Sequence, residues 1–519
     1  MNRLASAIAL LVIPTLLTAQ AAATADGAVR SAINSISETD VYNRIGVIAH
    51  DSMRGRDTPS PGLEMTANYI ADQFRTFGLQ PLGDNGSYLQ RFPLVRSSWD
   101  REGSTVTAAP DLELRLGDTF QLLGSAGAGA GPEELTGEVT GPAVIVAGRL
   151  TRIEQLADVD LAGAIVFAIA PTWNGEFTPA FAPLAGALAR RSPAAVIIVS
   201  NRSGVNFRQA ATNLDRTSLQ KGWEQRGAAS GILFLEVLDQ AVARFFRHHG
   251  FDLAEARANL HLPITSTRLS DTVTVTLRRR SVESTAPNVV GLLEGSSPTL
   301  RNEYIVFSAH MDHLGVGQPN AEGDSIYNGA DDDASGTVAV IELAEAFAML
   351  NPAPRRSLIF LTVSGEEKGK WGSDYFAGHP PVAIGQIVAN LNIDMIGRNW
   401  RDTIVVIGKE HSDLGETLDR VNTRHPELDM TAIDDIWPEE GFYSRSDHFN
   451  FAQRGVPILF FFSGPHEDYH GVNDEVEKID AEKESRIARL IFYLGLEIAN
   501  TTERPTWNPE SYEQIVEDQ

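Results

Sequence analysis

Four segments between residues 304 and 394 each contain acidic or imidazole side chains. Three of them, residues 304–309, 358–364 and 388–393, are runs of β-branched and aliphatic residues with polar residues at or just after the carboxyl end. An open α/β sheet places its ligands at that edge. The fourth, YNGADDDASG, opens a stretch with helical apolar spacing, so its carboxylates lie near a helix N-terminus, where the dipole favours their ionised form. We therefore expect one α/β unit with a polar site at one edge of its sheet.

Length and composition limit the classes of protein that fit. The chain has 519 residues, 43% of them hydrophobic, which is too long for one compact core and predicts two domains with short ends. The net charge is 43 − 68 = −25, and no cluster of Lys and Arg could neutralise phosphates, so we expect no nucleic acid partner. Without a single cysteine, the chain has neither a disulfide framework nor thiolate metal ligands.

The N-terminus has the pattern of a secretory signal peptide. Arg3 precedes an apolar run at residues 4–17, and small residues of the A-x-A type follow. The run is shorter than the ~20 residues that a membrane span needs, so we expect export to the periplasm or the extracellular space and no stable membrane anchor. An uncleaved anchor is the alternative.

The rest of the chain shows three zones. Residues 41–49 and 62–77 have helical spacing, with the turn-rich MRGRDTPSPG between them. Alternating strands and helices run from residue 288 to 500, and residues 501–519 predict an extended tail or a strap. The middle zone predicts a helix at 235–248, a loop at 124–131 and β-strands at residues 139–146, 164–170, 194–200, 232–237 and 272–277. Its three histidines, His248, His249 and His261, are predicted to be surface or packing residues.

Taken one at a time, the polar clusters are ambiguous. His310 and Asp312 lie two apart at a strand end, where the imidazole can bind a metal while the carboxylate orients it through the other ring nitrogen, but H-x-D is also a common surface pair. Residues 331–333 could equally cap a helix or bind calcium. Glu366 and Glu367 repel each other unless a cation or a shared proton compensates, so that one can bind a metal while the other acts as a base.

Further donors follow later in the chain. Asp394 ends an apolar strand, where an unpaired carboxylate is costly, so we expect a cation beside it. The loop after the apolar run 456–462 contains DYHGVND, in which His470 is the better ligand candidate. His466 is the second choice, and His448 is predicted to form a structural hydrogen bond. Together these nitrogen and oxygen donors suit two divalent ions, and the H-E-x-x-H motif of single-zinc proteases is absent.

The order of these motifs resembles that of a known family. HMDH, NGADDDASG, SGEEKGKWGS, NIDM, YSRSDH and DYHGVND are similar to the motifs of the co-catalytic di-zinc aminopeptidases, a family that also includes glutamate carboxypeptidases and glutaminyl cyclases. The resemblance covers residues 288–500, and residues 45–90 are similar to the N-terminal part of the same catalytic domain. The β-rich block between them resembles an inserted protease-associated domain. The implied fold is α/β, a mixed central sheet flanked by helices of the zinc exopeptidase-like (phosphorylase/hydrolase-like) kind.

The resemblance also implies domain boundaries. These are a signal peptide at 1–23, the N-terminal part of the catalytic domain at 27–96, an inserted protease-associated-like domain at 97–282, the catalytic di-zinc peptidase domain at 283–500 and a C-terminal tail at 501–519.

Residue roles follow from the matching motifs. Two Zn²⁺ per chain are implied, one held by His310 and Asp394, the other by Glu367 and His470, with Asp332 bridging them and a cis peptide bond after Asp332. Glu366 would be the general base, Asp312 would orient His310, and Tyr443 would stabilise the tetrahedral intermediate. In such sites two metals activate a water and polarise the scissile carbonyl, while the base takes the proton of the water and returns it to the leaving amine.

We therefore predict an exported zinc-dependent aminopeptidase that acts on peptides. A glutaminyl cyclase, an acyltransferase with one zinc, would be expected to lack the His310 side of the site, and a receptor-like protein without activity would lack ligands. A carboxypeptidase or dipeptidase needs a cation for the substrate carboxylate. Arg398 and Arg445 are candidates, but we expect them to pair with neighbouring acids such as Asp402 or Asp447. Side-chain preference and oligomeric state are not predicted.

Overall fold

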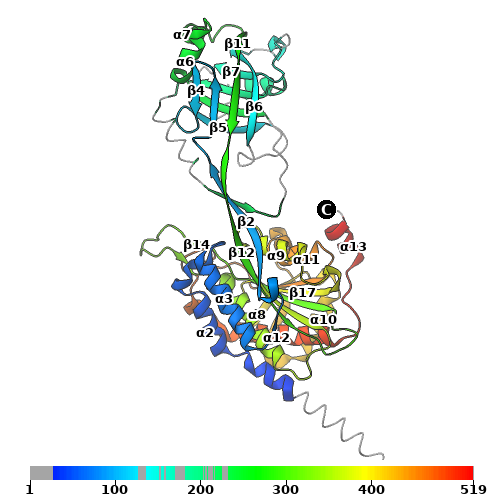
Figure 1. The fold of residues 1–519 in the computed structure, drawn as a ribbon. Coiled ribbons are helices and arrows are strands. Elements are labelled where there is room, and N and C mark those ends of the chain that lie inside the picture. Colours follow the sequence, from blue (N-terminus) through cyan, green and yellow to red (C-terminus); the bar gives the residue numbers. More distant parts are fainter. Residues whose placement is uncertain are drawn as a thin grey trace, which may run out of the picture. The chain divides into compact units, whose positions relative to one another are not determined.

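The structure is a computed structural model of residues 1–519. It describes residues 27–126, 136–150, 153–156, 159–169, 182–202, 204, 207, 214, 217–224 and 232–517. The chain divides into two compact units: unit 1 combines the chain up to Pro93 with the chain from Thr285 onward, and unit 2 is Leu94–Ser284 (Figure 1). The predicted signal peptide, residues 1–23, lies outside the described residues. None of the helices that the structure describes has the length and apolarity to cross a membrane.

Unit 1 is built on a mixed sheet whose middle strands are parallel. The strand order is β19-β18-β20-β17-β13-β16-β12-β2, with β1 beside β12. The strands are β1 (Gln80–Pro81), β2 (Leu89–Trp99), β12 (Arg279–Leu293), β13 (Tyr304–His310), β16 (Ser357–Val363), β17 (Ile387–Ile393), β18 (Thr403–Ile407), β19 (Thr431–Ile433) and β20 (Ile458–Phe462), and β14 (Gly315–Val316) pairs with β15 (Ile326–Tyr327) outside the sheet. Strands β16, β13, β17 and β20 run parallel, whereas β12 and β18 are antiparallel to their neighbours β16 and β20. Four carboxyl ends therefore meet at one edge.

Helices pack on both faces of this sheet (Figure 1). They are α2 (Glu38–Ile48), α3 (Pro61–Thr76), α8 (Gly336–Ala348), α9 (Trp371–Gly378), α10 (Leu414–Arg424), α11 (His448–Ala452), α12 (Ala481–Asn500) and α13 (Pro509–Tyr512). Because side chains alternate across a strand, Phe307 and Phe360 stack on one face, with ring centroids 5.4 Å apart, and both contact Phe347 of α8. The alternate positions Val306 and Ile359 belong to a cluster that includes side chains of α9 and α11.

The strands and helices predicted around the site are confirmed. Residues 304–309, 358–363 and 388–393 lie in β13, β16 and β17, residue 364 directly follows β16, and the helix expected after the acidic run is α8. The two N-terminal helices are also present as α2 and α3, and each begins at a serine whose hydroxyl accepts a main-chain N–H: Ser37 from Asp40 and Ser60 from Leu63.

Unit 2 contains an eight-stranded sheet with the order β4-β3-β11-β6-β7-β8-β10-β5. Its strands are β3 (Thr105–Ala108), β4 (Leu112–Arg115), β5 (Phe120–Ala126), β6 (Gly137–Ala147), β7 (Ile165–Ile169), β8 (Ala195–Ser200), β10 (Ile232–Leu238) and β11 (Thr265–Leu277), and β9 (Ser218–Lys221) pairs with the outer part of β2. The helices are α4 (Ala182–Ala189), α6 (Asp239–His248) and α7 (Leu253–Ala258). All five predicted strands are present.

Two local predictions in unit 2 are wrong. The helix expected at 235–248 begins only at Asp239, because the preceding residues continue β10 and pair in parallel with β8. Residues 124–126 of the expected loop belong to β5, and residues 127–131 lie outside the described residues. His248 and His249 lie 3.0 and 3.3 Å from aspartate side chains, as expected of surface or packing residues.

The C-terminal tail is a strap that ends in a short helix. Trp507 donates its indole N–H to the main-chain oxygen of Gly455 at 2.9 Å and forms an isolated bridge with Ser412. Helix α13 then begins at Pro509. The tail therefore packs on unit 1, and the prediction of a strap is confirmed for its first part.

Candidate metal centre

The predicted metal ligands meet at the carboxyl edge of the unit 1 sheet. His310 ends β13, Asp394 directly follows β17, and residues 366–367 follow β16. Asp332 lies in the turn that leads into α8, and His470 lies in the loop after β20. Strands β16, β13, β17 and β20 are parallel neighbours, so their ends bring residues more than 150 positions apart in the sequence together.

A first group of donors surrounds His310. Its Nε2 lies 3.2 Å from Asp332 Oδ1 and 3.6 Å from Asp394 Oδ1. Two ligands of one zinc ion at ~2.0–2.1 Å with tetrahedral angles lie roughly 3.4 Å apart, so these three donors have the spacing of metal ligands. The three residues are buried, and buried carboxylates this close together need a cation to offset their repulsion.

A second group surrounds Glu367. His470 Nε2 lies 3.2 Å from Asp332 Oδ2 and 3.5 Å from Glu367 Oε2. The two oxygens of Asp332 therefore face different groups, Oδ1 towards His310 and Oδ2 towards His470, as a bridging carboxylate requires. Burial alone would raise the pKa of Asp332, but the neighbouring histidines lower this pKa well below its usual value.

One member of the second group was missed in the sequence. His313 Nδ1 lies 2.8 Å from Glu367 Oε1 and 3.7 Å from Asp332 Oδ2, and the imidazole is completely buried. The sequence feature that could have identified it is the motif HMDH, in which His313 is the second histidine, three residues after His310. No role was predicted for this histidine.

The turn that contains Asp332 is held by hydrogen bonds to a residue from another segment, Asp474. The peptide bond between Asp332 and Asp333 is cis, as the resemblance implied. The carboxylate of Asp474 accepts the main-chain N–H of Asp331 at 3.0 and 3.1 Å and that of Asp332 at 3.1 Å. Burial raises the pKa of Asp474 to about 6. These contacts fix the direction in which the Asp332 side chain leaves the turn.

Asp333 lies close to the first group, but its oxygens have other partners. One oxygen is near enough to His310 and Asp394 to share an ion with them. However, its carboxylate accepts the main-chain N–H groups of His310 at 3.0 Å, Gly336 at 2.9 Å and Met395 at 3.1 Å. We therefore assign Asp333 to holding the backbone of the site, and Asp332 to the metal.

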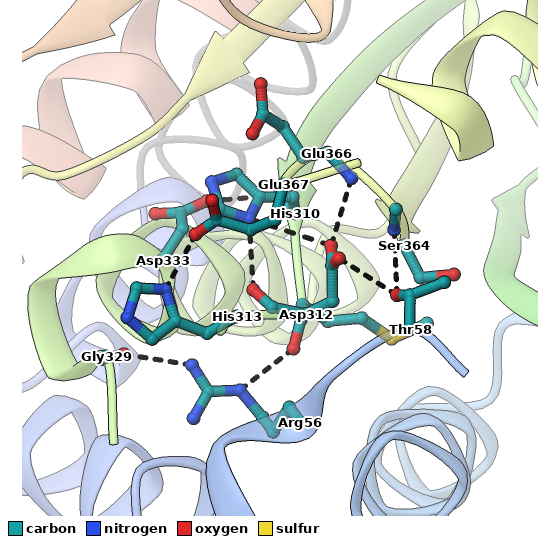
Figure 2. A network of polar contacts seen from close by, with 12 residues as sticks. Arg56, Thr58, His310, Asp312, His313, Gly329, Asp333, Ser364, Glu366 and Glu367 are labelled. Carbon is teal, nitrogen blue, oxygen red and sulfur yellow. Dashed lines mark hydrogen bonds and ion pairs between the residues drawn. The ribbon is translucent and has the colours of Figure 1, made fainter. Parts of the chain in front are cut away.

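The carboxylate of Asp312 does not hydrogen-bond to His310, contrary to prediction. His310 Nδ1 lies 3.2 Å from the main-chain oxygen of Asp312 and 3.8 Å from its carboxylate. The carboxylate instead accepts the hydroxyl of Thr58 at 2.9 Å and the main-chain N–H of Glu366 at 3.2 Å (Figure 2). The main chain therefore orients the imidazole, while the carboxylate ties the β16 loop to the N-terminal segment. Burial raises the pKa of Asp312 to about 6.

A buried arginine joins the segments around the site. Arg56 donates to four main-chain oxygens, those of Met311 at 2.9 Å, Ile48 at 3.0 Å, Asn328 at 2.6 Å and Gly329 at 2.9 Å (Figure 2). Burial lowers its pKa to about 10, so it is a cation at neutral pH. Its segment, MRGRDTPSPG, was predicted as a turn-rich loop, and no site role was predicted for Arg56.

Glu366 and Glu367 extend to different places. The carboxylate of Glu367 belongs to the second donor group, whereas that of Glu366 points away from it (Figure 2). Glu366 lines a cavity together with His310, Asp332, Asp394 and His470. The remainder of the lining is mostly apolar and consists of Met395, Phe442, Phe460, Phe462, Pro465 and Tyr469, with Arg445 and Ser446 beside them. Burial raises the pKa of Glu366 well above its usual value.

Tyr443 does not line this cavity. Its ring packs edge-on against His411, with centroids 4.4 Å apart, and among the described residues its hydroxyl has no hydrogen-bond partner. Burial raises the pKa of its phenol. The tyrosine that does line the cavity is Tyr469, so the geometry does not favour the predicted catalytic role of Tyr443.

His466, the second choice as a ligand, and His448 lie outside both donor groups. His466 Nε2 is 3.3 Å from Asp331 Oδ2. His448 Nε2 is 2.7 Å from the main-chain oxygen of Tyr443, which confirms its predicted structural hydrogen bond.

The two candidate arginines differ. Arg398 pairs with an acid, as expected, but the partner is Asp468 at 3.0 Å and not Asp402. Arg445 was expected to pair with Asp447, whose carboxylate instead accepts the hydroxyl of Ser373 at 2.5 Å. In the part of the chain that the structure describes, Arg445 has no carboxylate partner, and its guanidinium lies 4.8 Å from the centroid of the Phe442 ring.

The donor set suits two zinc ions. Imidazole nitrogens and carboxylate oxygens are the ligands that zinc takes in the absence of cysteine, and each group offers them at ligand spacing. In addition, Glu367 Oε1 and both ring nitrogens of His313 are buried without a hydrogen bond to any described residue, which is costly unless another partner binds them.

Part of the chain matches a known protein family. Residues 288–495 match the profile of Peptidase family M28. This part of the chain is similar to peptidase family M28. The M28 segment contains all five predicted ligands.

Individual relatives are distant. A probable zinc metalloprotease from Pyricularia oryzae is 28% identical over 255 residues, covering 41% of this chain and 50% of that protein. A probable leucine aminopeptidase from Arthroderma benhamiae is 27% identical over 225 residues, covering 42% of this chain and 58% of that protein. The chain thus spans about half the length of these curated relatives.

Among solved structures, the chain is similar to an aminopeptidase from Aneurinibacillus sp. strain AM-1, with 20% identity, a TM-score of 0.45 and coverage of 92% of this chain and 97% of that one. A peptidase M28 precursor from Shewanella amazonensis SB2B matches with 16% identity, a TM-score of 0.45 and coverage of 94% and 98%.

Proposed function

We propose that this chain is a zinc-dependent exopeptidase that removes N-terminal residues from peptides. The observation that carries the proposal is the bridging geometry of Asp332, whose two oxygens face separate donor groups inside an M28 segment. His310 and Asp394 would hold one zinc, and Glu367 and His470 the other. Retention of the His310 side argues against a one-zinc glutaminyl cyclase, and the complete ligand set argues against a receptor without activity.

The residues around the proposed zinc centre have distinct roles. When bound, the zinc ions would supply a water of lowered pKa and polarise the scissile carbonyl. Glu366 faces the cavity and is not committed to a donor group, so it can accept the proton of the attacking water and return it to the leaving amine. Asp312 and Arg56 hold the loops from which the ligands project.

The negative charge of the cavity favours binding of the amino end of a peptide substrate. Glu366 and Asp394 are lining carboxylates, and Asp332 adds a third. A free α-ammonium is attracted to such a site, and the apolar lining suits an apolar side chain on the first residue. We therefore propose peptides with an unblocked, apolar N-terminal residue as substrates.

Arg445 supports a second candidate, a carboxypeptidase or dipeptidase. It borders the cavity and has no carboxylate partner among the described residues, so it could bind a substrate carboxylate. Against this, a single exposed arginine faces three lining carboxylates.

A matched set of tetrapeptides distinguishes the two candidates. One sequence with an N-terminal leucine is prepared free at both ends, N-acetylated and C-amidated. An aminopeptidase cleaves the amidated peptide and fails on the acetylated one. The opposite pattern, with activity lost in Arg445→Ala, would establish the second candidate. Metal analysis of the purified protein is the companion measurement, since fewer than two zinc ions at saturation would contradict the co-catalytic centre.

We further propose that the protein is exported to the periplasm or the extracellular space, that residues 1–23 are its signal peptide, and that unit 2 is an inserted protease-associated domain. The first two rest on the charge and apolarity of the N-terminus, and the third on the β-rich character of unit 2 and its position between the two parts of unit 1.

A further inference from the structure

The five ligands implied by family resemblance leave one buried imidazole unexplained. His313 lies among Asp332, Glu367 and His470 and has no solvent exposure. Burying an imidazole without a partner is costly, and neither of its ring nitrogens has a hydrogen bond to a described residue.

A hydrogen bond to Glu367 does not account for the position of the ring. His313 Nδ1 and Glu367 Oε1 are only 2.8 Å apart, yet both atoms lack hydrogen-bond geometry. A ring N–H points along the ring plane, so a donor this close would be aligned if the contact were a hydrogen bond. A short separation without hydrogen-bond alignment is expected when two metal ligands point to a common ion that lies between them.

The distances within the group agree with one shared ion. His313 Nδ1 lies 2.8 Å from Glu367 and 3.7 Å from Asp332, and His470 Nε2 lies 3.5 Å and 3.2 Å from the same two side chains. All four values scatter around the roughly 3.4 Å expected between tetrahedral zinc ligands. The two imidazole rings approach edge to face, with centroids 5.9 Å apart. Two imidazole nitrogens therefore face the same two carboxylate groups, through Asp332 Oδ2 and one oxygen each of Glu367.

We propose that His313 Nδ1 is a fourth protein ligand of the zinc held by Asp332, Glu367 and His470. This inference rests on the proposed zinc centre and deepens it. Four protein ligands would hold a zinc ion more tightly than three. The zinc held by His313, Asp332, Glu367 and His470 should therefore exchange more slowly than the zinc held by His310, Asp332 and Asp394.

The inference is tested first on the unmodified protein. X-ray absorption of the zinc-loaded enzyme counts imidazoles per metal. The proposal predicts three imidazoles for two zinc ions, His310, His313 and His470, where the family set predicts two. Zinc release to a chromophoric chelator should have a fast and a slow phase of equal amplitude. Neither readout depends on activity.

Variants of His313 then show which zinc ion gives the slow phase of release. His313→Ala and His313→Asn should accelerate slow zinc release by at least 100-fold and reduce the imidazole count to two, while excess zinc still restores two ions per chain. His425→Ala is the matched control, because this imidazole stacks on Tyr493 at 3.5 Å, away from the centre, and its removal should change neither readout.

The outcomes separate the inference from the proposed function. Two zinc ions with two imidazoles in the wild type, or His313 variants with wild-type release, would overturn the role of His313 and leave the exopeptidase proposal standing. Fewer than two zinc ions at saturation in the wild type would overturn both. The imidazole count of the wild type decides the question even if a His313 variant fails to fold.

Discussion

Replacing Arg56 should weaken the metal centre together with the fold. Its guanidinium donates to the main-chain oxygen of Met311, which directly follows the ligand His310. It also donates to the main-chain oxygens of Asn328 and Gly329, just before the turn that contains Asp332. The perturbation is Arg56→Met, which keeps much of the side-chain length and removes the charge and all five donors.

The size of the effect follows from the lost hydrogen bonds. Four bonds from a charged donor are worth about 1.5–3 kcal/mol each, and several kcal/mol of this is offset because a guanidinium no longer has to be buried. We expect a net loss of about 3–5 kcal/mol in the free energy of unfolding. The same substitution should weaken zinc binding by about 10–100-fold, the range observed when outer partners of metal ligands are removed.

Arg356 provides the matched control. It is also fully buried and also donates to main-chain oxygens, those of Ile498 at 2.7 Å, Thr502 at 3.1 Å and Glu503 at 3.0 Å among them, but these lie at the end of α12 and in the tail. Arg356→Met should cost similar stability and leave zinc affinity unchanged. Denaturant unfolding and competition with a calibrated chelator measure the two quantities. If both variants weaken zinc equally, Arg56 has no particular role in the metal centre and the reasoning fails.

Three further predictions concern the base, pH and export. Glu366→Gln should keep both zinc ions and substrate binding while kcat falls by about 10²–10⁴; loss of zinc in this variant would mean that the base and the ligand are assigned in reverse. Burial lowers the pKa of His448 to about 3, below the ~6.5 of an unfolded histidine, so the unfolded chain takes up the proton first and stability falls as pH drops from about 6.5 towards 3. Between pH 7 and pH 5 this group alone should cost about 2 kcal/mol, and chelator-treated His448→Gln, compared with wild type at both pH values by denaturant unfolding, should lack that part of the slope. Mature protein from a secreting host should begin between Ala22 and Asp26 by mass spectrometry, and an exported form that retains Arg3 would replace the signal peptide with an anchor.

The strands and the ligands could be predicted because both depend on local patterns. Apolar β-branched runs formed the parallel strands, and the polar residues at their carboxyl ends had to meet at one edge. His310 and Asp394 were recognisable for this reason. Residues 235–237 were assigned to both a strand and a helix, because a short apolar run fits either pattern and only its pairing with β8 decides.

The remaining features depend on contacts between distant segments. Nothing in MRGRDTPSPG indicates that Arg56 will face carbonyls more than 250 residues away. The direction of the Tyr443 ring and the choice between the carboxylate and the main-chain oxygen of Asp312 are likewise set by packing. His313 was visible in its motif, but only the measured distances to Glu367 and Asp332 give it a role.

The division of unit 1 into two stretches of chain has a consequence for synthesis. Arg56 must wait for partners that lie 255 to 273 positions later, which at about 5–20 residues per second is roughly 15–50 s of translation. During that interval unit 2, which is continuous from Leu94 to Ser284, is finished and can fold first, while α2 and α3 have no sheet to cover. The apolar faces of these helices are therefore the part of the nascent chain most in need of a chaperone. A ribosome-bound chain stopped before residue 304 should expose them to one, and a chain extended beyond residue 500 should not.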